Sequence, residues 1–201
     1  MQSDKSILQR AISLCNEACF AVALQHRRLR STEPEDNTFV FRWWVDLQFL
    51  IVALRRLRRS AAIVGCVPVL SGLIDSALHE FDDALPSLAK MRNVGEHVED
   101  YALGRGRNKS VPSGELQVGC LDWPVYSWLD ESLDLDTALA AAQELLEAIR
   151  GCVPLIRPSR SSPSSPPHPY SADHCGRAGL RKSSSQYPDL RPPRRKLCVC
   201  R

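Results

Sequence analysis

The sequence lacks any uninterrupted apolar run near the roughly 20 residues that a helix needs to cross a bilayer. Residues 1–5 lead into an amphipathic pattern, not into the apolar segment of a secretory signal. The chain also lacks internal repeats and the aromatic signatures of RNA-recognition domains, which excludes that class of RNA-binding fold. These absences lead us to expect a cytoplasmic protein with no membrane partner.

Cysteines are present, but they lack the sequence spacing of metal ligands. Of the eight cysteines, Cys15 and Cys19 lie one helical turn apart, and no histidine or second cysteine pair has the spacing that zinc requires. The others in the first 157 residues are scattered through apolar stretches, where a free cysteine behaves as a small hydrophobe. We therefore expect reduced thiols, no disulfide framework, no metal and no cofactor.

The charge divides sharply near Pro158. Residues 1–157 hold 17 Lys+Arg and 21 Asp+Glu, a formal charge of −4, whereas residues 158–201 hold 9 and 2, a charge of +7. The second segment is rich in Ser, Pro and Arg and too poor in large apolar residues to offset the entropy of ordering. It predicts a disordered basic tail, either an arm that contacts RNA phosphates or a plain solvated extension.

Apolar residues in the first segment repeat every three to four positions, which is typical of helices that bury one face. The expected helices span residues 3–27, 38–65, 67–85, 86–104 and 136–151. Period-two alternation around the Trp123-Pro124 turn predicts a small β-hairpin over residues 115–129. The fold class is thus an all-α, up-and-down bundle of four to five helices in residues 1–157, with one hairpin insertion and a disordered tail over 158–201.

Three polar residues of the helix expected at 86–104 stand out: Arg92, Asn93 and His97. At 3.6 residues per turn, Asn93 and His97 lie one above the other and Tyr101 continues the row. Arginine is always charged, and histidine exchanges a proton near neutral pH. That pair suits phosphodiester chemistry.

The arrangement resembles the R-x4–6-H motif of the HEPN superfamily, in which a polar residue often follows the arginine. The resemblance implies a small helical bundle, and in many members a metal-independent RNase of toxin–antitoxin or other defence systems. It implies a homodimer whose two motifs form one composite site, with an antitoxin-like protein as a further partner. By this resemblance His97 moves a proton, Arg92 holds the scissile phosphate and Asn93 orients it, which leaves a 2′,3′-cyclic phosphate.

The same residues also have a purely structural interpretation. Arg92 and Glu96 form an i,i+4 pair on a helix, and His97 can hydrogen-bond Asp100. Glu96 also departs from the expected site, because its charge repels phosphate. The alternative function is therefore a non-catalytic helical protein-interaction module.

Two basic clusters could meet RNA. Arg105, Arg107 and Lys109 follow the motif in a Gly-rich loop, so we assign them to RNA contacts, with an ordinary solvated loop as the alternative. Four arginines between residues 55 and 59 close the second expected helix, where cations complement the helix dipole without any ligand.

Overall fold

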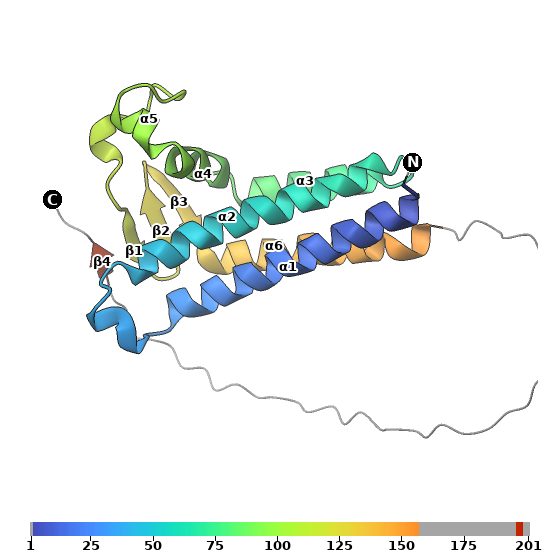
Figure 1. Ribbon diagram of the computed structural model, residues 1–201, viewed down its shortest axis with the longest axis horizontal. Helices are drawn as coiled ribbons and strands as arrows, with labels where there is room; N and C mark the ends of the chain where they lie inside the picture. The colour runs from blue at the N-terminus through green and yellow to red at the C-terminus, as the bar shows by residue number, and fades with distance from the viewer. Residues whose placement is uncertain (1, 157–195, 199–201) are drawn as a thin grey trace, which may run out of the picture.

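The computed structural model describes residues 2–156 and 196–198, and four long helices run along its length (Figure 1). These are α1 (Asp4–Arg30), α2 (Arg42–Ala62), α3 (Ser71–Ala84) and α6 (Leu135–Gly151). α1 packs along α2 and α6, and α3 packs against the same two helices. Successive helices alternate in direction (Figure 1), so the expected up-and-down bundle is confirmed.

Two of the helices, α1 and α6, begin at side-chain caps. The Ser3 side chain accepts a hydrogen bond from the Ser6 N–H at the start of α1, and Asp134 caps α6 through the Thr137 N–H. The described residues also form short 3-10 helices: η1 (Pro34–Asn37), η2 (Ile63–Cys66), η3 (Ser113–Glu115) and η4 (Val153–Leu155).

A small sheet lies at the end of the bundle where α1 finishes and α2 begins (Figure 1). Its antiparallel strands follow the order β3-β2-β1-β4: β1 (Cys120–Asp122), β2 (Val125–Trp128), β3 (Glu131–Asp134) and β4 (Lys196–Cys198). The β1–β2 hairpin was expected, whereas β3 was not. β4 comes from the segment expected to be a disordered tail, and the rest of that segment lies outside the described residues.

The helix expected at 86–104 is two helices in the structure, so this prediction is wrong. α4 (Leu88–Glu96) ends before His97, whose φ of −126° and ψ of 33° are not helical, and α5 (Val98–Ala102) begins after it. Local periodicity did not reveal this break. The Tyr101 ring is buried against Gly106, where an added Cβ would lie 2.2 Å from the ring.

The cysteines differ from expectation at one position. Cys15, Cys19, Cys66 and Cys152 are free thiols, as expected, but Cys120 is disulfide-bonded. The Cys15 thiol faces the Leu57 carbonyl and the Cys19 thiol faces the Ala142 carbonyl, so the two sulfurs contact different helices.

α1 contains a longer apolar stretch than the sequence analysis expected. Its 27 residues include a window of mean hydropathy 1.3, so by length and composition alone it is a candidate to cross a membrane. Core helices satisfy the same criterion, and α1 buries one face against α2 and α6.

Candidate functional site in the groove between α2 and α4

The site begins with the two faces of α2. Leu47, Leu50, Leu54 and Leu57 are fully buried in the bundle. Helical spacing therefore places Arg55 and Arg59, which are four residues apart, together on the side of α2 away from that buried row. This side meets α4.

α4 packs against α2. A Cβ at Gly95 of α4 would lie 2.9 Å from the Gln48 side-chain oxygen of α2, the end of a flexible side chain that can move aside. The packing of the two helices places Arg92 of α4 beside the arginines of α2.

Between these helices lies an open groove of about 320 Å³. It is lined by residues of α2, η2 and α4: Val52, Arg55, Arg56, Arg59, Ser60, Ile63, Arg92 and Glu96. Four arginines and one glutamate leave this groove strongly positive, although residues 1–157 carry a formal charge of −4.

Arg55 is the most constrained cation of the groove. Its pKa is lowered by burial first, and then by repulsion from Arg58, Arg59 and Arg92. Its Nε is buried and has no hydrogen-bond partner within the described part of the chain. A buried donor without an acceptor is unfavourable, and a bound anion would satisfy it and relieve the repulsion.

Three other arginines of this region have carboxylate partners, and one of them, Arg56, pairs with Glu17 of α1 at 2.9 Å. Arg92 forms an ion pair with Glu96, one turn along α4. Arg58 is bound at both ends of its guanidinium by Asp82 of α3, and this pairing raises the Arg58 pKa. Arg58 therefore joins two helices and does not line the groove.

His97 lies at the exposed junction between α4 and α5. Among the contacts of residues 2–156, none joins its ring to Arg92 or to Asp100. Arg92 faces α2, so within one chain the structure does not bring together the two residues that carry the motif.

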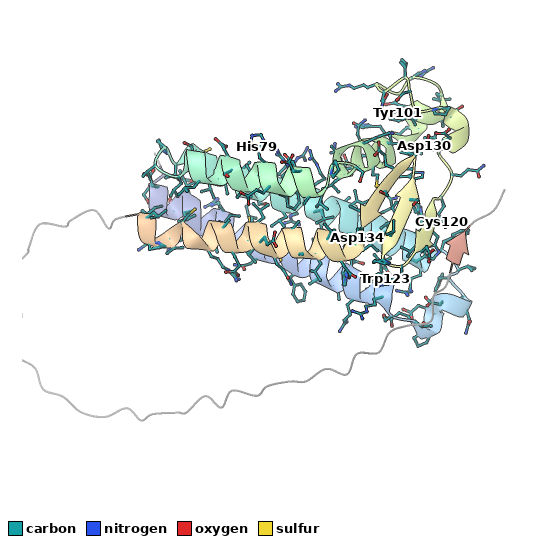
Figure 2. The ribbon with its side chains drawn as sticks, turned by 180° about the vertical axis from the view of Figure 1, so that it is seen from behind. His79, Tyr101, Cys120, Trp123, Asp130 and Asp134 are labelled. Atoms are coloured by element: carbon teal, nitrogen blue, oxygen red, sulfur yellow. The ribbon has the colours of Figure 1, made fainter. Side chains whose placement is uncertain are left out.

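The Asn93 side chain is hydrogen-bonded to Tyr101 of α5. Its side-chain N–H donates to the Tyr101 hydroxyl at 2.9 Å, and the Asn108 backbone N–H donates to the same oxygen at 3.3 Å. Tyr101, which is labelled in Figure 2, thus connects α4 to the loop that follows α5. Asn93 and Tyr101, which were expected on one face of a single helix, are thus in contact despite the helix break.

The loop cations are exposed as expected. Arg105, Arg107 and Lys109 all lie on the surface, and the Lys109 ammonium donates to the Gly104 carbonyl at 3.2 Å. Within the described residues, no three His, Cys, Asp or Glu side chains gather as metal ligands would. The residues that sequence reasoning undervalued are Arg55 and Arg59, since their clustering was attributed to the helix dipole.

Comparisons with models of protein families, with curated proteins and with solved structures find no match to this chain.

Proposed function

We propose that the chain binds single-stranded RNA and that the groove between α2 and α4 holds its phosphates. The observation that carries this proposal is Arg55, a half-buried arginine that lies among like charges and whose buried Nε has an unused donor. Phosphate oxygens accept from guanidinium donors in a bidentate manner, so Arg55, Arg59 and Arg92 suit a sugar-phosphate backbone. RNA, as opposed to another polyanion, is favoured by the resemblance of Arg92, Asn93 and His97 to the HEPN motif.

Binding can be measured by the fluorescence anisotropy of a labelled single-stranded RNA. Arg55→Ala and Arg92→Ala should each weaken binding by about tenfold, the loss of one charge-assisted contact. Arg30→Ala is the matched control, because it removes an exposed arginine at the far end of α1 from the groove. An equal loss in the control would mean that RNA responds to net charge and not to this groove. Binding of duplex DNA or heparin with equal affinity would contradict the choice of RNA.

RNA cleavage is the second candidate function, and the exposed position of His97 favours it. His97 is solvent-exposed and has no ion pair in the described region, so RNA can reach its ring, and imidazole is the commonest general acid or base in enzymes. Cleavage would leave a 2′,3′-cyclic phosphate and a 5′-hydroxyl while Arg92 holds the phosphate. Because Arg92 faces α2, productive geometry needs either a second protomer, as in the HEPN resemblance, or movement at the α4–α5 junction.

The test is cleavage of single-stranded RNA in the presence of EDTA, with product ends identified by mass spectrometry. His97→Ala should abolish cleavage and leave RNA binding and the helical circular dichroism unchanged. Arg92→Lys should be impaired as well, since lysine lacks the planar fork. RNA binding without cleavage by the wild type would leave a non-catalytic binding module as the function.

A further inference from the structure

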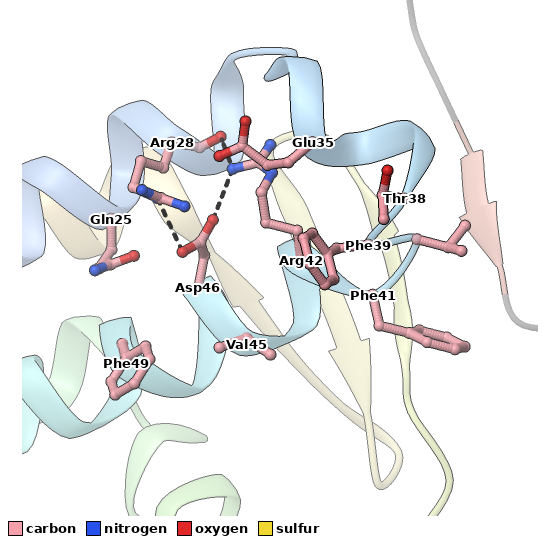
Figure 3. Close-up of a pocket in the computed structure, with 11 residues that line it drawn as sticks. Gln25, Arg28, Glu35, Thr38, Phe39, Phe41, Arg42, Val45, Asp46 and Phe49 are labelled. Atoms are coloured by element: carbon pink, nitrogen blue, oxygen red, sulfur yellow. Dashed lines mark hydrogen bonds and ion pairs between the residues drawn. The ribbon is translucent and has the colours of Figure 1, made fainter.

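α2 carries a second exposed feature, an apolar patch beside its first turns. The patch consists of six side chains that are each 45–71% exposed: Phe39, Val40, Phe41, Val45, Phe49 and Val52. Five of them, together with neighbouring polar residues of α1, η1 and α2, enclose an open depression of about 740 Å³. Figure 3 shows Phe41, Val45 and Phe49 following one another along α2.

The patch is a regular helical face. Phe41, Val45, Phe49 and Val52 are spaced by four, four and three residues, so they share one side of α2. The buried leucines occupy the other side. A helix that is apolar on two faces has two surfaces to cover, and the described part of this chain covers only one.

The base of the patch is held rigidly. Arg42 uses all five of its N–H donors, on Asp36, Asp46 and the carbonyls of Arg28 and Ser31. Arg28 also donates to Asp46 at 3.0 Å (Figure 3). This network fixes η1 against α1 and α2, so the apolar side chains above it are presented in a defined arrangement.

The two ends of the patch carry opposite charges. Glu33, Glu35 and Asp36 lie in and beside η1, before the patch, while the arginines of residues 55–59 follow it on α2. Two-fold symmetric interfaces use the same surface twice, so such a surface must complement itself. An apolar centre between an acidic and a basic end meets this condition when the two copies of α2 run antiparallel.

We propose that the apolar patch binds a second copy of this chain, with α2 antiparallel to its counterpart across a two-fold axis near Val45. In this pairing Arg56 of one protomer lies near Glu35 of the partner subunit. Arg56 is available, because its present pair with Glu17 joins two side chains that are each more than half exposed. The apolar centre supplies the attraction, and the charged ends set the orientation.

This dimer borders the proposed RNA groove. Most of the patch extends from α2 toward α1, whose Gln25 and Arg28 border it, but Val52 and Arg56 of the interface also line the groove. The interface is therefore tested at Phe49, which lines the depression and not the groove.

Sedimentation equilibrium of the full chain at concentrations on the order of 1–100 µM tests the interface. The wild type should be a dimer, and Phe49→Glu should weaken association by at least about tenfold because it buries a charge at the centre of the patch. Phe20→Glu is the matched control: Phe20 is 71% exposed on α1 and lies outside the patch, so that variant should remain dimeric. Melting curves of both variants report whether the fold is retained.

A charge exchange tests the orientation. Glu35→Arg and Arg56→Glu should each weaken the dimer, and the double variant should restore it because opposite charges meet again across the axis. A monomeric wild type, or a dimer that Phe49→Glu leaves intact, would overturn the interface. Absence of rescue in the double variant would overturn the antiparallel register. Phe49→Glu should still bind RNA, because Phe49 does not line the groove; loss of the dimer with RNA binding retained separates this proposal from the function of the groove.

Discussion

Glu96 is the one carboxylate of the RNA groove and is the residue most opposed to phosphate binding. It forms an ion pair with Arg92 and so competes for the guanidinium that the RNA would use. Glu96→Gln removes the repulsion and keeps the shape of the side chain. We expect this variant to bind single-stranded RNA about three- to tenfold more tightly, measured by anisotropy at fixed salt. Glu99→Gln, an exposed position of α5, is the control and should change affinity little. Weaker binding by Glu96→Gln would mean that Arg92 needs its partner to stay in place.

The buried Arg42 side chain holds the acidic residues of η1 and α2 in place. Burial alone lowers its pKa, but the hydrogen bond and charge of Asp36, together with Asp46, more than offset this and raise the pKa. Arg42→Met would leave Asp46 buried with fewer partners and should lower the free energy of unfolding by about 3 kcal/mol. Arg42→Lys should recover only part of this, because an ammonium cannot reach both carboxylates and two carbonyls. Urea unfolding measures both, and full recovery by lysine would show that charge alone matters here.

Thiol reactivity should separate the free cysteines. Burial, and secondarily Cys19, raises the pKa of Cys15 from 9.0 to about 12. Cys66 is exposed. Iodoacetamide at pH 8 should therefore modify Cys66 rapidly in the native protein and Cys15 only after unfolding, as peptide mass spectrometry can show. Raising the pH from 9 to 12 ionises Cys15 in the unfolded chain before the folded one, so its contribution to stability is lost over that window. Fast native labelling of Cys15 would contradict the burial of α1.

At the scale of elements, the turn between β2 and β3 is the least expected feature. Leu129 and Asp130 both have positive φ, 58° and 57°, as the central residues of a tight hairpin turn do. Side chains other than glycine and asparagine are strained there. Asp130→Gly should stabilise the protein by up to about 1 kcal/mol, measured by urea unfolding, because the relief of strain exceeds the entropy lost by glycine. Gly104 also has positive φ, so Gly104→Ala should lower the free energy of unfolding.

The turn between β2 and β3 is also an example of what the sequence could not predict. Helix positions and caps follow from local periodicity and side-chain chemistry, so α1 and α6 could be predicted within a few residues. β3 could not, because Leu129-Asp130 lacks the Asn-Gly or Asp-Gly signal of such a turn. The break at His97 and the arginine groove could not either, since both depend on contacts between segments far apart in the chain. Arg92 and His97 could be found as residues, but the direction in which each points is a property of the fold.

At the scale of the whole molecule, the sheet and the helices share one core. The Trp44 ring of α2 lies 5.4 Å from the Trp128 ring of β2 and 6.1 Å from the Tyr126 ring, both centroid to centroid. Ser87, before α4, donates to the Ser132 carbonyl of β3 at 2.7 Å. The insertion between α3 and α6 is thus continuous with the bundle, and its residues belong to the same buried cluster.

A shared core predicts one cooperative unfolding transition. The four tryptophans, Trp43, Trp44, Trp123 and Trp128, lie in the strands, their turn or the adjoining start of α2, so fluorescence reports that end, while circular dichroism reports the helices. Urea midpoints from the two signals should coincide. Leu8 is buried near the opposite end of α1 (Figure 1), and Leu8→Ala should lower stability by about 2–4 kcal/mol and shift both midpoints equally. If the mutation moves only the dichroism midpoint, the sheet belongs to a unit that unfolds separately from the far end of the bundle.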